Sequence, residues 1–510
     1  MTKLKLLFLA SFALLSASSA RAATITVTVS NTRYQTVTGF GAACCDGAMR
    51  PYATDTKPVK LLYGPQSPIG LNIMRMEISP NFKGNITAAD VGWDTPYDWT
   101  GSVPSAREAK RRGAIIFGTP WSPPGAYKTN GTAQGGNSEE QGYQRGELRT
   151  DCYDKFFPWL NIFLSYMNDT AKVAVDAVSV QNEPDWWVSY SGCLYTPEQQ
   201  LNLVKNYAHM LDREKYGVRL ISAEPLGFDP KYSDMLLNDH VAREQVDIIA
   251  GHIYGHPPLG NLKKAAVLAE QYGKEVWMTE HSSDNIGNHN GLPTWREQLI
   301  FAEELNECLL AGCTGYIYWY MRAHWAFVGT GEEEHMPGNT KNELLPRAYV
   351  MSHFSKHVTG STRLATTPTK ASGQGAAAEY SAFIKGDSLI VMSIDTTKNA
   401  HNLKLMLPVK VKSGVHLKST GNEAENLCQE LPIEIDEPTD EVIVEMPAYS
   451  INSYIFMIDE GTTAIKEESL NEDPGTKTYY DLHGRRMNAP HSICIERWAD
   501  GTSRKVYLGN

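Results

Sequence analysis

From about residue 39 to residue 357, short apolar runs alternate with longer amphipathic segments. The apolar runs are rich in β-branched residues, which is typical of buried strands, and the longer segments repeat apolar positions at helical spacing. Eight strands are predicted, at 39–43, 71–78, 113–118, 175–180, 218–223, 246–252, 275–279 and 315–320. Helices are predicted at 106–112, 153–168, 197–216, 262–272 and 294–310.

This alternation predicts an α/β fold, because strands joined through helices run parallel. Eight such units favour a (β/α)8 TIM barrel over an open doubly wound sheet. A Rossmann-type sheet would also need a glycine-rich phosphate loop of the G-x-G-x-x-G kind, which does not occur at the expected place. We therefore expect a barrel over residues 39–360, with its functional groups at the carboxyl ends of the strands.

The pattern changes after the barrel. Residues 361–459 contain short segments of alternating polarity, which predict an associated β-sandwich side domain. Residues 23–38 begin with the strand-like sequence TITVTV, and we expect them to supply an N-terminal strand of that sandwich. Residues 460–510 are predicted to be a polar linker followed by a short C-terminal β tail.

Residues 1–22 have the features of an export signal. Lys3 and Lys5 precede an apolar run at 6–15, and small residues follow up to the Ala20-Arg21-Ala22 site. We therefore expect a secreted protein from which the signal has been removed. No later run approaches the ~20 apolar residues of a transmembrane helix, so no membrane span is predicted.

Composition narrows the range of partners. The chain has 47 Lys and Arg against 58 Asp and Glu, a net charge of −11, and no basic stripe, which argues against nucleic acid. The eight cysteines do not have zinc-knuckle or redox spacing, and no disulfide pairing is predicted. We expect a monomer without a metal or cofactor, acting on a polysaccharide or oligosaccharide.

The predicted strand ends carry carboxylates, an amide, basic side chains and aromatic rings. The members of this set are Arg75, Trp121, Asn182, Glu183, Glu224, His252, Tyr254, Glu280, Trp319 and Arg322. Two carboxyl groups, one protonated and one ionised, are what cleavage of a glycosidic bond requires. Glu183 and Glu280, each at the end of a strand, are the predicted catalytic pair.

The surroundings predicted for the two carboxyl groups differ, as this chemistry demands. Trp186 and Trp187 would give Glu183 a drier setting that favours the neutral acid. Arg75, Tyr254 and His252 would keep Glu280 ionised. In a retaining enzyme the two carboxyl groups should lie about 5–5.5 Å apart.

Several short motifs occur in a fixed order between about residues 24 and 459. They are Thr38-Gly39-Phe40-Gly41, Met74-Arg75, Thr119-Pro120-Trp121-Ser122-Pro123-Pro124, Ser179-Val180-Gln181-Asn182-Glu183-Pro184, Gly251-His252-Ile253-Tyr254-Gly255, Trp277-Met278-Thr279-Glu280, Tyr318-Trp319-Tyr320 and Ser352-His353-Phe354-Ser355-Lys356. In these motifs the chain resembles glycoside hydrolase family 30 of clan A, and in particular its subfamily of bacterial xylanases and glucuronoxylanases.

The resemblance implies a barrel with a side β-sandwich and a retaining, double-displacement mechanism. It implies that Glu183 is the acid/base and Glu280 the nucleophile. The substrate-binding residues would be Arg75, Trp121, Asn182, His252, Tyr254, Trp319, Tyr320 and Arg322. Aromatic rings among them suit a pyranose, whose apolar face stacks on a ring while its hydroxyls reach polar groups.

One departure from the subfamily concerns the branch sugar. Glucuronoxylanases of this kind carry two consecutive arginines after the last barrel strand, whereas this chain has Arg322 followed by Ala323. An alanine cannot provide the two-pronged donor that a carboxylate prefers. The expected activity is therefore an endo-β-1,4-xylanase without strict dependence on glucuronate. A glucuronoxylanase, another family 30 β-glycosidase and a β-1,6-glucanase are the alternatives.

Two other classes of function remain open. Several histidines, among them His252, His256 and His281, would suit a metal-dependent barrel hydrolase, although Gly255 and Pro257 argue against a helical two-histidine site. A carbohydrate-binding protein without activity would keep the aromatics but lose a carboxylate. Glu224 is the rival carboxylate, and we expect it to be a hydrogen-bonding neighbour of the pair.

Overall fold

A computed structural model of the chain describes residues 24–45, 54–80, 100–136, 145–255, 258–282, 294–322, 326–332, 339–369, 378–421, 428–459, 478–480, 486–487, 493–497 and 503–507. The predicted export signal at 1–22, the predicted linker at 460–477 and Ala323 lie outside these residues. The chain divides into two compact units, Met1–Ile458 and Asp459–Asn510.

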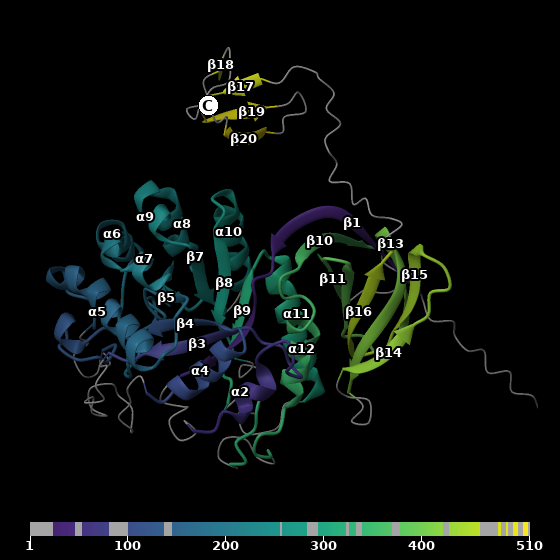
Figure 1. Cartoon of the computed structure of the whole chain (residues 1–510), viewed down its shortest axis with the longest axis horizontal. Helices are drawn as coiled ribbons and strands as arrows, with labels where there is room; N and C mark the ends of the chain where they lie inside the picture. The colour runs from purple at the N-terminus through teal and green to yellow at the C-terminus, as the bar shows by residue number, and fades with distance from the viewer. Residues whose placement is uncertain are drawn as a thin grey trace, which may run out of the picture. The chain divides into compact units, whose positions relative to one another are not determined.

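Eight parallel strands close into a barrel in the first unit, which confirms the predicted α/β barrel fold (Figure 1). The strands, in their order around the barrel, are β2 (Gly39–Cys44), β3 (Ile73–Ile78), β4 (Ile115–Pro120), β5 (Ala177–Ser179), β6 (Arg219–Ile221), β7 (Ile248–His252), β8 (Glu275–Glu280) and β9 (Gly315–Tyr318). Each differs from its predicted range by a few residues at the ends, where local pattern is least informative.

The barrel interior is filled by side chains from its strands. One buried cluster comprises Ile73, Phe117, Ala177, Ile221, Ile248, Ala250, Trp277 and Ile317. The largest of them, Trp277, meets Phe117 edge-on with 5.6 Å between the ring centroids. The barrel is therefore a packed core rather than a pore, and only its ends are free to build a site.

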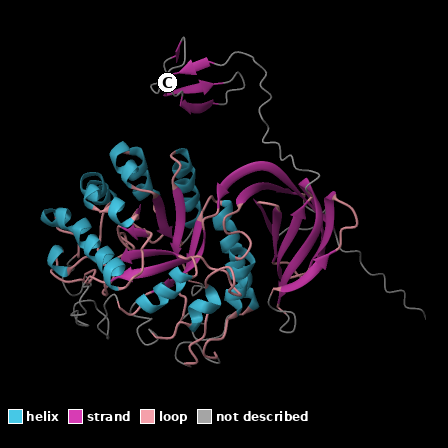
Figure 2. Ribbon diagram, viewed as in Figure 1, coloured by secondary structure: helices cyan, strands magenta, loops and turns pink. Residues whose placement is uncertain are grey.

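Helices cover the outside of the barrel (Figure 2). They are α2 (Lys57–Leu62), α4 (Val103–Arg111), α5 (Tyr153–Ser165), α6 (Pro197–Tyr207), α7 (Arg213–Tyr216), α8 (Pro230–Asn238), α9 (His240–Gln245), α10 (Pro258–Gln271), α11 (Trp295–Leu310) and α12 (Pro346–Ser355). The cap at Thr196 forms a full capping box with Gln199, as its position before a proline suggests.

The prediction of a single helix at 197–216 is wrong. The structure ends α6 at Tyr207, continues with a short 3₁₀ turn at Ala208–Met210, and starts α7 at Arg213. A tertiary contact accompanies the break, because the backbone N–H of Asp212 donates to the side-chain oxygen of Asn161, 2.9 Å away on α5. The helices α8 and α9 were not predicted. Both are short, and aspartates at 229 and 239 cap their first turns.

The remaining strands of the first unit form the side domain. They are β1 (Thr24–Thr36), β10 (Thr362–Pro368), β11 (Ala378–Lys385), β12 (Ser388–Asp395), β13 (His401–Thr420), β14 (Gln429–Ile433), β15 (Thr439–Met446) and β16 (Ser450–Ile458). The first half of β13 pairs with β1 and β15, and its second half pairs with β14 and β16. One strand of 20 residues thus takes part in both sets of pairings.

The side domain is joined to barrel helices through buried polar contacts. On α12, the two ring nitrogens of His353 each lie 2.8 Å from a serine hydroxyl, one of Ser453 and one of Ser419. On α11, Asn306 donates a 2.9 Å hydrogen bond to Glu379 of β11. The N-terminal strand β1 runs antiparallel to β10 and parallel to β13, so it is part of this domain.

The second unit contains a small antiparallel sheet in the order β18-β17-β19-β20. Its strands are β17 (Thr478–Tyr480), β18 (Arg486–Met487), β19 (Ile493–Arg497) and β20 (Ser503–Tyr507). Among the residues that the structure describes, no helix has the length and apolar character needed to cross a membrane.

Candidate active site

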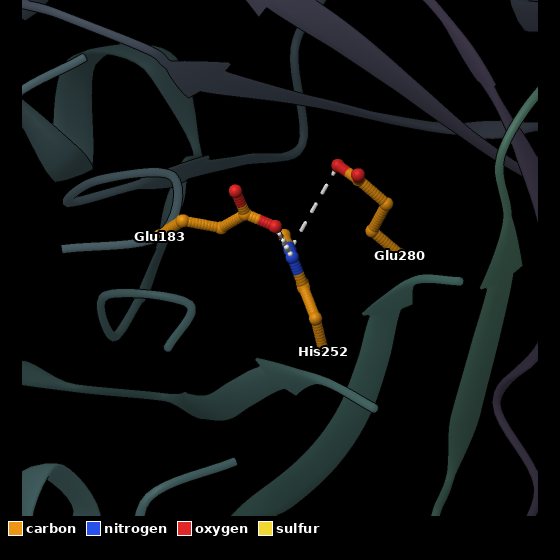
Figure 3. A group of neighbouring side chains, drawn as sticks. All are labelled: Glu183, His252 and Glu280. Carbon is orange, nitrogen blue, oxygen red and sulfur yellow. Dashed lines mark hydrogen bonds and ion pairs between the residues drawn. The ribbon is translucent and has the colours of Figure 1, made fainter. Parts of the chain in front are cut away.

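Side chains from four barrel strands meet at the carboxyl end of the barrel. Arg75 lies on β3, His252 ends β7, Glu280 ends β8, and Glu183 lies four residues beyond the end of β5. Figure 3 shows the carboxyl groups of Glu183 and Glu280 turned toward each other, with the imidazole of His252 beside both. An oxygen of Glu183, an oxygen of Glu280 and a ring nitrogen of His252 lie within 4.8 Å of one another.

The backbone around Glu183 is held on both sides after the strand has ended. The N–H of Asn182 donates to the carbonyl of Pro120, and the N–H of Glu183 donates to that of Glu224, each at 2.9 Å. Glu183 itself has a φ of 41°, a left-handed conformation that costs a residue with a side chain about 1–2 kcal/mol. Such strain persists where the surrounding structure fixes it and is common at functional sites.

Arg75 is the central cation of the cluster. It is fully buried, and one terminal nitrogen, Nη1, pairs with Oε2 of Glu280. The other, Nη2, donates to Asn182 Oδ1 at 2.7 Å and to Glu224 Oε2 at 3.0 Å. Burial alone would lower the pKa of Arg75, but Glu224 and Glu280 raise it, so the guanidinium stays charged.

His252 connects the three carboxylates. Its Nδ1 lies 2.9 Å from Oε1 of Glu183, and its Nε2 lies 3.3 Å from Oε2 of Glu224 and 4.0 Å from Oε2 of Glu280. Burial lowers the pKa of His252, but Glu280 and then the hydrogen bonds to Glu183 and Glu224 outweigh it and raise the pKa to about 9. The imidazole is therefore protonated at neutral pH and donates from both nitrogens.

The carboxyl groups respond differently to burial. Burial raises the pKa of Glu183, and the hydrogen bond from His252 opposes this only in part, so the pKa stays above its ordinary value. Burial would also raise the pKa of Glu224, but Arg75 and then His252 lower it to about 2. Glu224 is therefore permanently ionised, while Glu183 retains a proton more readily than an exposed glutamate.

Glu280 is placed by three neighbours. Besides Arg75 and His252, the hydroxyl of Tyr254 donates to its Oε1 at 3.2 Å. The predicted association of Glu280 with these three residues is therefore present in the structure. Only 7% of Glu280 and 8% of Glu183 are exposed, so each opens on to the site through a small part of its surface.

Aromatic rings surround the carboxyl pair. Trp121 follows β4 and Trp319 follows β9, with 5.8 Å between their ring centroids, and Tyr320 lies against Trp319 at 4.1 Å. The guanidinium of Arg75 lies 4.6 Å from the centroid of the Trp121 ring. Trp121 forms a small buried cluster with Ala43 and Cys45. The rings of Trp319, Tyr320 and Tyr190 pack against this cluster.

Tyr190 was missed by sequence reasoning. It lies in the loop that follows Glu183, ten residues beyond the predicted strand at 175–180, where no periodic pattern indicates which side chains turn inward. Burial raises the pKa of Tyr190, and the charges of Glu183 and Glu280 raise it further. By contrast, 51% of Trp186 is exposed, so it does not dry the surroundings of Glu183.

Comparisons with known proteins identify the chemistry. Residues 155–309, which run from α5 to α11 and include both Glu183 and Glu280, match a family model described as a glycosyl hydrolase catalytic core. A solved structure of the glycoside hydrolase family 30 subfamily 8 xylanase Xyn30A from Clostridium acetobutylicum matches with a TM-score of 0.67 and 27% identity. That match covers 85% of this chain and 99% of the other. The chain is a glycoside hydrolase that is similar to those of family 30.

Curated relatives of this glycoside hydrolase agree with the structural match. The glucuronoxylanase XynC of Bacillus subtilis is 25% identical over 393 residues, which cover 76% of this chain and 82% of the relative. A putative glucosylceramidase 3 of Caenorhabditis elegans is 24% identical over 418 residues, covering 74% and 76%. The resemblance to family 30 that the motifs suggested is thereby confirmed.

Arg322, which is predicted to bind substrate, forms an ion pair with an aspartate. Its side chain is fully buried, and its Nη1 pairs with Oδ2 of Asp55 at 3.2 Å. Asp55 also accepts a hydrogen bond from the side chain of Asn342 at 3.3 Å. These contacts give Arg322 a structural place between the segment before α2 and the segment before α12.

The donor set of Glu183, His252 and Glu280 could be mistaken for a metal site. A metal ligand needs an imidazole nitrogen with a free lone pair, whereas both nitrogens of His252 are engaged by carboxylates and protonated. The guanidinium of Arg75 also lies against Glu280 and would repel a cation. Acid–base and nucleophilic chemistry on a bound substrate suits this arrangement better than metal binding.

The raised pKa of His252 predicts a pH-dependent contribution to stability. An ordinary histidine has a pKa of about 6.5, so the folded state binds this proton more tightly than the unfolded state does. The contribution is complete below about pH 6.5 and is lost as the pH rises through about 9. We expect His252→Gln to lower the melting temperature most at about pH 6 and progressively less up to about pH 9.5.

Melting curves of the wild type and the variant across this range provide the measurement. The exposed His240 serves as the control site, since His240→Gln should leave the melting temperature close to that of the wild type at every pH. A gap between His252→Gln and the wild type that stayed constant with pH would contradict a proton held more tightly in the fold.

Proposed function

We propose that this glycoside hydrolase is a secreted, retaining endo-β-1,4-xylanase that does not require glucuronate branches on its substrate. The observation that carries the mechanism is the approach of the Glu183 and Glu280 oxygens to within 4.8 Å. Retaining glycosidases have carboxyl groups about 5–5.5 Å apart, whereas inverting enzymes leave about 6.5–9.5 Å for a water molecule. The arrangement thus favours direct attack by a carboxylate on the anomeric carbon.

Glu280 is the proposed nucleophile. In the first step its carboxylate bonds to the anomeric carbon while the bond to the leaving oxygen breaks. Arg75 pairs with it and the hydroxyl of Tyr254 donates to it, and these contacts fix its orientation. Because Arg75 also holds Glu224, this cation is not moved when the charge on Glu280 is lost in the covalent intermediate.

Glu183 is the proposed acid/base. Its Oε1 accepts a hydrogen bond from His252, which leaves Oε2 to carry the proton that passes to the leaving oxygen. In the second step Glu183 takes a proton from water, and the resulting hydroxide oxygen displaces Glu280 from the sugar. The raised pKa of Glu183 supports the protonated starting state.

Asn182 is proposed to bind the hydroxyl next to the reacting carbon. Its Oδ1 accepts a hydrogen bond from Arg75, so its amide nitrogen remains to donate to a sugar hydroxyl. Trp121, Trp319 and Tyr320 are proposed to face the sugar, while Arg322 is proposed to support the site indirectly through Asp55. His252 acts on the substrate only through Glu183.

The choice of xylan is supported by the relatives, which are named as a glucuronoxylanase and a xylanase. Independence from glucuronate is supported by the sequence, in which Ala323 follows Arg322 where a second arginine would bind a carboxylate. Secretion is supported by the charged and apolar pattern of residues 1–22.

Substitution of the two carboxylates separates their roles. We expect Glu280→Gln to abolish turnover of every glycoside. Glu183→Ala should slow cleavage of polysaccharide by about 10²–10⁴-fold and have little effect on aryl glycosides with good leaving groups, because only poor leaving groups need a proton. Added azide should restore turnover of an activated substrate by Glu183→Ala and give a β-glycosyl azide, identified by NMR.

The exposed Glu214 is the matched control, and Glu214→Gln should keep the wild-type rate. Near-normal cleavage of polysaccharide by Glu183→Ala, or an α-configured azide product, would show that the roles are assigned wrongly.

A panel of polysaccharides tests the proposed substrate. The protein is incubated with glucuronoxylan, arabinoxylan, linear xylan and 1,6-glucan, and the products are separated by size. We expect a ladder of oligosaccharides from linear xylan as well as from the branched xylans. Products from glucuronoxylan alone would contradict the role given to Ala323, and products from 1,6-glucan alone would contradict xylan as the substrate.

Treatment with a chelator distinguishes this mechanism from that of a metal-dependent hydrolase. We expect activity on the preferred substrate to be unchanged after prolonged incubation with EDTA, because both nitrogens of His252 are committed to carboxylates. Loss of activity that is restored by adding back a divalent cation would favour the metal-dependent class.

A further inference from the structure

The loop that follows the proposed acid/base brings an additional aromatic side chain to the site. Residues 184–195, called here the Tyr190 loop, start directly after Glu183. The Tyr190 ring packs on the same cluster of Ala43, Cys45 and Trp121 that Trp319 and Tyr320 contact. Tyr190 is thus the one member of this aromatic group that comes from the chain segment carrying Glu183.

The Tyr190 loop is paired through its backbone with residues 133–136. The N–H of Gly135 donates to the carbonyl of Tyr190 at 2.8 Å, and the N–H of Gly192 donates to that of Ala133 at 3.1 Å. Gln134 and Ser191 form an antiparallel bridge between them. The backbone carbonyl of Tyr190 is therefore bound by a second loop.

Glycines allow the two segments to approach this closely. A Cβ added at Gly135 would lie 2.5 Å from the carbonyl oxygen of Val188, and one added at Gly192 would lie 2.6 Å from the Val188 side chain. Neither position has room for a side chain, so the pairing depends on both glycines.

A buried ammonium group crosses this pairing. Lys128 is 2% exposed, and its Nζ donates to the carbonyls of Ala133 at 3.1 Å and Gln134 at 2.5 Å, and to that of Gly192. Two of these acceptors belong to the 133–136 segment and the third to the Tyr190 loop. All three ammonium hydrogens are thereby used, which is the condition for burying a charge.

Lys128 and the carbonyls of Ala133, Gln134 and Gly192 that it binds are called here the Lys128 clamp. The cost of burying the charge of Lys128 suggests that this clamp has a function. Burial lowers the pKa of Lys128 to about 8, so the ammonium is held at some expense of free energy. An apolar side chain could fill the same space, but it could not bind three carbonyls from two loops. The clamp holds the backbone beside Tyr190, and the Tyr190 ring packs against Trp121, whose ring lies 4.6 Å from the guanidinium of Arg75. Arg75 in turn pairs with Glu280.

We propose that Tyr190 contacts the sugar unit bound between Glu183 and Glu280, and that Lys128 is the positioning residue that holds Tyr190 there. This inference rests on the proposed glycosidase roles of the two glutamates. The ring supplies an apolar surface for the pyranose, and the hydroxyl supplies a donor or acceptor for a sugar hydroxyl. Neither residue exchanges a proton with the substrate in this role.

Kinetics on the best substrate of the wild type test the contact. We expect Tyr190→Ala to lower kcat/KM by about 10-fold or more, and Tyr190→Phe to lower it by less, because the ring is kept. The control is Tyr272, an exposed residue directly after α10, and Tyr272→Ala should retain the wild-type kcat/KM. A Tyr190→Ala enzyme with unchanged kcat/KM would overturn the contact.

A double-mutant cycle tests the positioning role. We expect Lys128→Met to lower kcat/KM about as much as Tyr190→Ala does, and to have little additional effect when Tyr190 is already alanine. If Lys128 had only a structural role, Lys128→Met would lower the melting temperature. Any effect of this variant on kcat/KM would then multiply with that of Tyr190→Ala in the double variant. That multiplicative outcome would overturn the role of Lys128. The exposed Lys263 provides the control variant Lys263→Met.

The result is separable from the test of the proposed function. If the wild type cleaves a glycoside and Glu280→Gln does not, the catalytic roles stand, and equal rates for wild type and Tyr190→Ala would then reject only this inference. If Lys128→Met did not fold, the comparison of Tyr190→Phe with Tyr190→Ala would still decide the contact. A wild type inactive on every glycoside would overturn both proposals.

Discussion

The charge balance around Arg75 is the constraint on which the active site depends. Three carboxyl groups are buried close together around Arg75 and protonated His252, which are the two cations among them in the part of the chain that the structure describes. With Glu224 and Glu280 ionised, the charges of the cluster sum to zero when Glu183 carries a proton. The protonation state required for the first step of glycoside cleavage is therefore also the state that a buried cluster favours, since an uncompensated charge in a dry site is costly.

This balance is possible because the barrel closes. Arg75 and Glu280 are 205 positions apart in the sequence, and Asn182 and Glu224 approach the same guanidinium from two further strands. Parallel strands of a barrel all end at the same edge, so the fold itself brings together the residues that follow successive strands. The left-handed backbone at Glu183 and its hydrogen bonds to the neighbouring strand ends then direct one carboxyl group across the opening.

The barrel ends and the loops contribute differently to function. Strand-end residues are held by the ladder of the barrel, and they include the proposed catalytic pair. The chain is similar to enzymes named for xylan and for glucosylceramide. A shared fold and shared carboxylates do not fix the substrate. The Tyr190 loop and its Lys128 clamp lie outside the strands. We propose that contacts made by such loops give each related enzyme its own substrate preference.

Local pattern in the sequence determined the eight strands and the residues that stand at each strand end, because alternating polarity and the interruptions made by proline and glycine act over a few neighbouring residues. It therefore determined that Glu183, Glu280 and Arg75 would share one edge. Only the tertiary structure decided that Arg322 is buried with Asp55, that His252 bridges Glu183 and Glu224, and that Tyr190 packs on the aromatic cluster. Each of these depends on contacts between distant segments in three dimensions, which no short-range periodicity encodes.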